Sequence, residues 1–335
     1  MRKLLSSAVL AMLVLTLLTG CSTDVPAEVS TPGQPDPAVT ETTQQSETVS
    51  AAPPEASTNA PAVDRAGNPI TVPMELERII SLAPATTQTV VHMGLSDKLV
   101  AIDTNSAIIE GIPEGLPTVD LLSPDTELLI TLDADLVLCS AMTGYDGSEP
   151  LKPLSDAGVC IAVIPTSKSI DGIKEDLIFV ADLVGRHDKG VSFIEELESG
   201  IQEIKDAVGG AAAKGVYFEI AAAPAAYSFG GGTFMNEMIE IAGGKNIFDD
   251  MDGWLAVSEE QLITRNPDVI FTNVNYIDDP VGEILSRTSL QGVAAVAGQQ
   301  VFFVDNYASS LANEYVLTAI RQMAAAMHPD LWQNG

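Results

Sequence analysis

Residues that commonly hold metals or attack substrates are few in this chain and stand far apart. Its 335 residues include three cysteines and three histidines, and their spacing fits neither a zinc site nor a disulfide framework. Residues 230–232 are all glycine and precede Thr233, but no lysine follows at the position that a phosphate-binding loop requires. No Gly-x-Ser-x-Gly motif occurs. We therefore expect no catalytic residue, no metal site and no permanently bound cofactor.

Acidic side chains dominate the charge. The chain has 46 Asp and Glu against 16 Lys and Arg, a formal net charge of -30 at pH 7. Because phosphate binding needs clustered cations, this composition argues against nucleic acid as a partner. Hydrophobic residues make up 46% of the chain, which is enough for the cores of one large or two small globular units.

The first residues are typical of an exported lipoprotein. Arg2 and Lys3 precede a largely apolar stretch, residues 8–18, that is too short to span a membrane and suits a signal peptide. Residues 18–21, Leu-Thr-Gly-Cys, resemble a bacterial lipobox. We expect residues 1–20 to be a lipoprotein signal peptide and Cys21 to carry a diacylglyceryl group; ordinary secretion with a chance cysteine is the alternative. The acidic, proline- and threonine-rich residues 21–63 predict a disordered tether on the outer face of the cytoplasmic membrane.

From residue 64 onward the pattern predicts an α/β protein, because short apolar runs alternate with helical periodicity. Between residues 187 and 209, apolar side chains recur at intervals of three and four, and we expect a long connecting helix over residues 188–210. The other expected elements are strands at 78–84, 98–102, 135–138, 159–164, 216–220, 269–272 and 301–304, helices at 86–93, 234–242 and 311–327, and an edge hairpin at 64–72.

A repeat relates the two halves of this region. Residues 127–131, Glu-Leu-Leu-Ile-Thr, precede a strand that starts at Asp135, and residues 260–264, Glu-Gln-Leu-Ile-Thr, precede one that starts at Asp268, at a constant offset of 133 positions. A polar start caps a short helix in both copies. We infer two similar three-layer α/β lobes with mainly parallel sheets, residues 64–187 and 211–330. The connecting helix would leave a cleft between them at the carboxyl ends of the strands.

Several stretches, in order, resemble the substrate-binding lipoproteins of iron-chelate and cobalamin ABC importers. The stretches are residues 78–87, 123–138, 227–234, 242–248, 254–262 and 301–305, and the resemblance covers about residues 64–330. It implies two lobes bridged by a rigid helix, with a ligand held between them under little hinge closure. It also implies a monomer that is not an enzyme and that delivers its ligand to an ABC permease and its ATPase.

In this family, one glutamate on each lobe pairs with arginines of the permease, and the residues that match are Glu127 and Glu260. The same two residues begin the repeat. A carboxylate in the first turn of a helix is favoured by the helix dipole, and two of them on separate lobes would give a charge-steered, two-point dock. Simple stabilisation of each helix is the alternative role.

The resemblance implies an iron complex as ligand, a siderophore or haem; cobalamin, or a sensory or adhesive role on the same fold, are the alternatives. Cobalamin binders of the family usually carry a tryptophan shortly before the first-lobe glutamate, and haem binders can carry a methionine there, whereas this chain has Leu121 and Leu122. Aromatic side chains suit a rigid ring or chelate. Candidate ligand contacts, on or near loops that follow strands, are Ser81, Thr86, Met142, Tyr145, Tyr227, Phe229, Trp254, Tyr276 and Tyr307.

Cys139 ends one expected strand and Cys160 opens the next, so the two lie at opposite ends of neighbouring parallel strands. Such a separation exceeds the roughly 7 Å between Cα atoms that a disulfide can span. We expect two free, mostly buried thiols.

Overall fold

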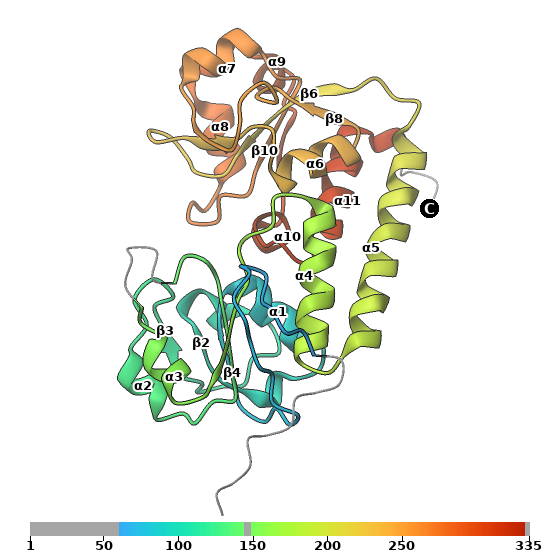
Figure 1. Ribbon diagram of the computed structural model, residues 1–335. Helices are drawn as coiled ribbons and strands as arrows, with labels where there is room; N and C mark the ends of the chain where they lie inside the picture. The colour runs from blue at the N-terminus through green and yellow to red at the C-terminus, as the bar shows by residue number, and fades with distance from the viewer. Residues whose placement is uncertain (1–59, 144–148, 332–335) are drawn as a thin grey trace, which may run out of the picture. The chain divides into compact units, whose positions relative to one another are not determined.

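Two parallel sheets organise the computed structural model, which describes residues 60–143 and 149–331 (Figure 1). The first has the strand order β3-β2-β1-β4-β5, and the second the order β11-β10-β6-β8. All pairings within these sheets are parallel, and this confirms the predicted α/β class with mainly parallel sheets. The strands are β1 (Ile79–Leu82), β2 (Leu99–Asp103), β3 (Thr118–Val119), β4 (Leu136–Cys139), β5 (Cys160–Val163), β6 (Lys214–Glu219), β8 (Gly244–Asn246), β10 (Val269–Thr272) and β11 (Val301–Phe303), together with the antiparallel pair β7 (Tyr227–Phe229) and β9 (Trp254–Ala256).

Helices follow most of the strands. They are α1 (Pro84–His92), α2 (Thr126–Ile130), α3 (Lys152–Asp156), α4 (Ile170–Leu183), α5 (His187–Val208), α6 (Phe234–Ile241), α7 (Glu259–Arg265), α8 (Pro280–Ser286), α9 (Ala294–Ala297), α10 (Asn306–Ser310) and α11 (Val316–Met327), with 3₁₀ turns η1 (Ser96–Lys98), η2 (Thr104–Ile108), η3 (Thr288–Leu290) and η4 (Pro329–Leu331).

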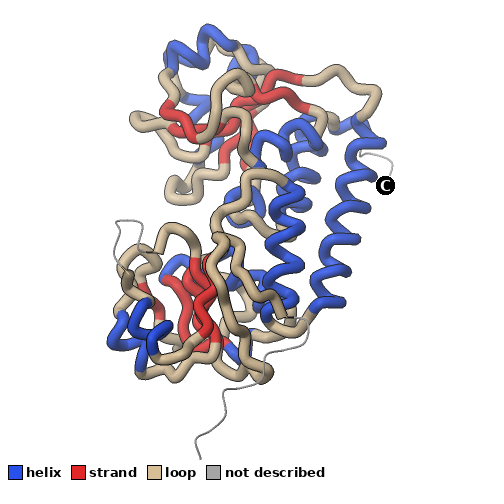
Figure 2. Tube along the Cα trace, in the orientation of Figure 1, coloured by secondary structure: helices blue, strands red, loops and turns tan. Residues whose placement is uncertain are grey.

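The first sheet is buried on both faces, so its strands read as continuous apolar runs. Ile79 faces one core cluster with Val90 of α1 and Phe179 of α4. Ile80 faces the other with Leu129 of α2 and Leu154 of α3. Helices α2 and α3 therefore cover one face, and α1 and α4 the other, as Figure 2 shows. We call this three-layer unit the N-terminal lobe.

The second sheet repeats this arrangement. Phe218 of β6 packs in one core cluster with side chains of α6 and α11, and Tyr217 packs in another with Leu262 of α7 and Ile284 of α8. We call this unit the C-terminal lobe. The alternation of neighbouring residues between two clusters is the expected result of the twofold side-chain period of a strand.

Two long helices, and not one, belong to both cores. The apolar stripe of α5 is buried at Leu197 and Ile201 in the C-terminal-lobe core, and Phe193 packs against the N-terminal-lobe core. Its observed bounds differ slightly from the expected residues 188–210. Helix α4, which the sequence reading did not identify, runs beside α5 (Figure 1). Its first half, with Ile173, packs in a cluster with C-terminal-lobe residues, and its second half, with Phe179, packs in the N-terminal lobe.

The repeat is present in the backbone. Strand β4 pairs with β1 in the same way that β10 pairs with β6, with Leu136 opposite Ile79 and Val269 opposite Val216. Just before each strand, Asp133 and Asn266 both adopt φ 44°, a left-handed conformation that few residues other than glycine take up. The offset of 133 positions therefore extends from the two glutamates through the strands.

Some expected boundaries are wrong. The last helix begins at Val316 and not at residue 311, because residues 306–310 form the separate helix α10. The edge hairpin at 64–72 is reduced to a single bridge between Val63 and Pro69, held by the Asp64 carboxylate, which accepts from the backbone of Asn68. Residues 60–63, expected in the tether, belong to the N-terminal lobe, since Ala60 packs on its core and Ile70 donates a hydrogen bond to the Ala62 carbonyl.

Both strand cysteines are free and buried, as predicted. Leu136 of β4 lies opposite Cys160 of β5, so Cys139 lies at the far end of the pair. Burial raises the pKa of the Cys139 thiol to about 12 and that of Cys160 to about 11. In the part of the chain that the structure describes, no helix is both long and apolar enough to cross a membrane. The expected signal peptide, Cys21 and most of the tether lie outside the described residues.

Candidate functional site

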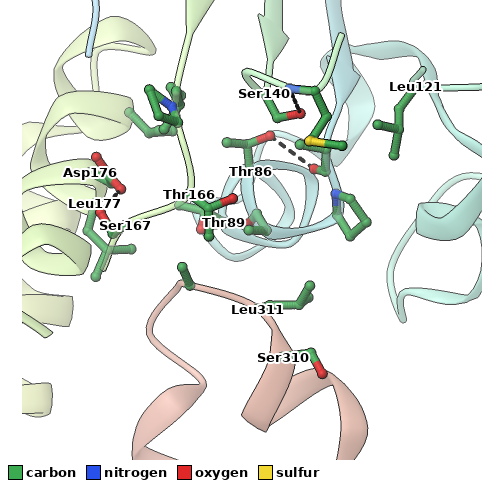
Figure 3. A pocket seen from close by; sticks show the side chains of 18 residues that line it. Thr86, Thr89, Leu121, Ser140, Thr166, Ser167, Asp176, Leu177, Ser310 and Leu311 are labelled. Atoms are coloured by element: carbon green, nitrogen blue, oxygen red, sulfur yellow. Dashed lines mark hydrogen bonds between the residues drawn. The ribbon is translucent and has the colours of Figure 1, made fainter. Parts of the chain in front are cut away.

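A cavity of about 190 Å³ lies at the carboxyl ends of three neighbouring strands of the N-terminal lobe. Its walls are the start of α1 after β1, the loop after β4, the loop after β5, and one side of α4. The end of α10 and the two residues that follow it close the cavity from the C-terminal half, and Figure 3 shows Leu311 below Thr86 and Thr89 of α1. The lining residues include Thr86, Thr89, Leu121, Ser140, Met142, Ser167, Asp176, Leu177, Val180, Ser310 and Leu311.

The chain can build this cavity because parallel strands end at one edge of their sheet. Pro84 stands at the first turn of α1, where its fixed φ and missing N–H are tolerated, so the helix starts directly after β1. Thr86 and Thr89 are three residues apart on α1 and therefore share the face that lines the cavity.

The lining is apolar with scattered hydroxyl groups. Asp176 is the one ionisable residue among the described lining residues, and these contain no lysine, arginine or histidine. Its carboxylate accepts from Arg65 at 2.6 Å and from Ser167, so its charge is compensated. Burial nevertheless raises the pKa of Asp176 above its usual value. Such a surface can take up apolar and hydrogen-bonding groups, but it offers no cation to neutralise an anionic ligand.

Of the predicted ligand contacts, Thr86 and Met142 line this cavity. Ser81 does not, because it is fully buried in β1 and its hydroxyl accepts from Thr87 at 2.7 Å. Phe229 is also fully buried, in the core of the C-terminal lobe. These two predictions of direct contact are wrong, since a strand-end position says nothing about which side chain reaches the surface. Tyr145 lies outside the described residues.

Three further candidates are exposed aromatic residues of the C-terminal lobe. Tyr227 and Trp254 lie on the small β7–β9 sheet, where Trp254 is opposite Phe229 and meets its ring edge-on at 6.2 Å between centroids. The Tyr276 hydroxyl accepts from the Ala222 backbone N–H at 2.9 Å. Trp254 is 49% exposed and Tyr276 66%, and neither they nor Tyr227 line the cavity.

Tyr307, the last of the predicted contacts, does not line the cavity. Its hydroxyl donates to the Asn105 carbonyl at 3.1 Å, so it joins α10 to the N-terminal lobe. Desolvation raises the pKa of this phenol. Sequence reasoning missed several cavity residues: Asp176 and Leu177 lie on α4, which was not predicted, and Leu311 was hidden by the incorrect extension of the last helix.

The two glutamates of the repeat occupy equivalent positions. Glu127 is the second residue of α2, which is capped by Asp125, and Glu260 is the second residue of α7, which is capped by Ser258. Both are exposed. Within residues 60–143 and 149–331, neither carboxylate forms an ion pair or a side-chain hydrogen bond.

No group of three or more histidine, cysteine or acidic side chains is arranged to hold a metal ion in the described ranges. The nearest soft donor to the cavity is the thioether of Met142, which is 49% exposed.

Comparisons with known proteins agree with this architecture. The chain is 24% identical over 274 residues to the uncharacterized ABC transporter substrate-binding lipoprotein YvrC of Bacillus subtilis (strain 168), covering 81% of this chain and 86% of that protein. It is 30% identical over 203 residues to the vitamin B12-binding protein of Yersinia pestis (strain Pestoides F), covering 60% of this chain and 71% of that protein.

Among solved structures, a possible iron-binding periplasmic solute-binding protein from Staphylococcus epidermidis ATCC 12228 superimposes with a TM-score of 0.66 at 25% identity. The match covers 76% of this chain and 99% of that one. The family model described as Periplasmic binding protein matches residues 79–308, which include both sheets and both glutamates. The chain therefore belongs to the periplasmic binding protein family.

Proposed function

We propose that this chain is the extracytoplasmic substrate-binding component of an ABC importer and that it captures an iron complex and delivers it to the permease. Family membership and the resemblance to substrate-binding lipoproteins support the transport class. Anchoring through Cys21 would keep the binding protein close to the permease.

The observation that carries the choice of cargo is the lack of cations in the described lining of the cavity. A buried anionic ligand would need neutralising partners. Arg65, which is not itself a lining residue, is already paired with the lining carboxylate of Asp176. Arg265 and Arg287 are engaged elsewhere: Arg265 contacts Asp250, and Arg287 makes a bidentate pair with Glu219 at 2.7 and 2.8 Å. The lining therefore favours a ferric chelate without net negative charge, such as a tris-hydroxamate, over a tris-catecholate or haem.

The contacts would divide by chemistry. Leu121, Leu177 and Leu311 would cover apolar parts of the chelate, and the hydroxyl groups of Thr86 and Ser140 would bond to its polar atoms. The cavity volume is below the roughly 300–1,000 Å³ of sites that enclose a drug-sized ligand. Only one edge of the chelate would therefore enter the cavity.

Cobalamin is the second candidate, because a relative at 30% identity is a vitamin B12-binding protein. Leu121, which lines the cavity, stands where cobalamin binders of the family usually have a tryptophan, and this disfavours the corrinoid.

Calorimetric titration of the full-length lipoprotein tests the proposal, because it needs no reporter side chain in the cavity. The probes are a ferric tris-hydroxamate, a ferric tris-catecholate, haem and cyanocobalamin. We expect saturable binding of the hydroxamate, weakened roughly tenfold or more in Leu311→Glu, which brings a carboxylate to the cavity, and unchanged in the control Ile108→Glu on an exposed surface. Preferential binding of the catecholate or haem would contradict the charge argument. Saturation by cyanocobalamin alone would favour the second candidate. No binding of any probe would contradict transport of these metal complexes.

A further inference from the structure

Beside each of the two exposed glutamates lies an exposed isoleucine at an equivalent position. Ile130 follows Glu127 by three residues, and Ile263 follows Glu260 by three, so each pair shares one face of its helix. Ile130 is 48% exposed and Ile263 is 49% exposed. The two lobes thus present the same combination of carboxylate and branched apolar side chain to nearly the same extent.

The orientation of these isoleucines is determined by the residues beside them. Leu129 and Leu262 are almost fully buried and attach α2 and α7 to their lobes. With the leucine packed inward, the next residue points outward. A single exposed isoleucine needs no explanation. Here two exposed isoleucines occupy matched places in a duplicated element. Each lies beside a carboxylate that has no ion pair in the described chain. This indicates that both lobes use the same kind of surface to contact a partner.

We infer that Ile130 and Ile263 are the apolar half of a two-part contact with the permease, whose other half is formed by Glu127 and Glu260. The inference rests on the proposed function. It commits to a membrane-protein partner that offers, at two places, a cation next to an apolar recess. Charge complementarity supports this occupant, since the chain carries a net charge of -30 and both carboxylates are exposed.

The two halves of the contact have different physical effects. The glutamates attract the partner over a distance, and this attraction is screened by salt. The isoleucines act only on contact, by removing apolar surface from water, and their contribution does not depend on salt. Loss of the isoleucines should therefore shorten the life of the complex, whereas loss of the glutamates should mainly slow its formation.

Uptake of an ⁵⁵Fe-labelled tris-hydroxamate tests the inference in source cells whose own copy is replaced by a variant of the full-length lipoprotein. One double variant is Glu127→Ala with Glu260→Ala, and the other is Ile130→Ser with Ile263→Ser. The matched control is Ile108→Ser, which removes an isoleucine that is 72% exposed but lies outside the repeated helices. Calorimetric affinity for the chelate and the melting temperature are measured for each variant.

We expect the glutamate pair and the isoleucine pair each to lower uptake roughly tenfold or more, with chelate affinity and melting temperature unchanged, and the control to match the wild type. Replacement of both isoleucines by valine should restore uptake, since it keeps an apolar branched side chain. Normal uptake in the serine pair with defective uptake in the glutamate pair would overturn this inference and leave the proposed function in place. Normal uptake in both pairs would contradict docking through these helices altogether. If the chelate does not bind the wild type, the proposed function fails first, at the calorimetric step.

A photo-crosslinking amino acid at position 130 or 263 gives a second readout that needs no ligand. We expect both positions to crosslink to one polytopic membrane protein, with the yield lost in the glutamate variant and absent from position 108. Crosslinks from the two positions to different proteins, or equal yields from position 108, would overturn the inference.

Discussion

At the scale of single residues, the glycines at 230–232 show how a sequence signal for chemistry can have a packing origin. Gly230 donates its N–H to the Gly253 carbonyl at 2.7 Å, and Gly231 donates to the Met251 carbonyl at 2.7 Å. A Cβ at Gly230 would lie 1.9 Å from the Met251 oxygen. The run therefore allows two backbone segments to approach closely, and it is not a phosphate cradle.

Replacing Gly230 by alanine should destabilise the protein by about 2–4 kcal/mol, because the methyl group meets rigid backbone and forces the two segments apart. Thermal unfolding followed by circular dichroism measures the effect. Gly292→Ala is the matched control, since a Cβ there meets nothing within 4 Å. Equal melting temperatures for the two variants would show that the segments separate freely.

At the scale of elements, the start of α7 is the most strongly specified helix end near the proposed dock. The Ser258 hydroxyl accepts from the Gln261 N–H at 3.3 Å, and the Gln261 side chain accepts from the Ser258 N–H at 2.9 Å, which is a capping box. At its other end, Asn266 adopts the left-handed conformation and accepts from the Ala294 N–H. Both ends orient the face that carries Glu260 and Ile263.

Ser258→Ala should lower the free energy of unfolding by about 1 kcal/mol, because the Gln261 N–H loses its side-chain acceptor. Ser258→Asp should keep most of the stability, since aspartate also caps helices. The comparison of their melting curves is the measurement. A serine-to-alanine effect within error of zero would mean that water replaces the cap.

At the scale of the whole described unit, a polar cluster connects α1 to residues 313–315, just before α11. The Asn313 side-chain amide donates to the side-chain Oε1 of Gln88 at 2.8 Å, and both residues are buried. His92 lies between the Glu314 carboxylate and the Tyr315 hydroxyl, with 2.6 Å to each. Together with α4 and α5, these contacts oppose large relative motion of the two lobes.

A double-mutant cycle on Gln88 and Asn313 should give a coupling free energy of about 0.5–1.5 kcal/mol. Asn313→Ala alone should cost more than this, because it leaves the side-chain oxygen of Gln88 buried without its donor. Melting temperatures of the two single variants and the double variant provide the cycle. Strict additivity would show that this contact does not hold the two lobes together.

The amino-acid sequence alone determined the features that depend on local pattern. The strands around residues 79, 136 and 269, the stripe of α5, the free cysteines and the repeat were predicted, since buried parallel strands and amphipathic helices have their own periodicities. The equivalence of Glu127 and Glu260 also followed from spacing alone. Their docking role stays a prediction.

Only the tertiary structure decided which side chains surround the cavity. Ser81 and Thr86 stand five residues apart, yet Ser81 is fully buried and Thr86 lines the cavity. Leu311 reaches the cavity because α10 ends at Ser310. Helix α4 packs in the cores of both lobes because it extends from one to the other. Exposure depends on contacts between residues far apart in the chain, and such contacts leave no periodic trace in the sequence.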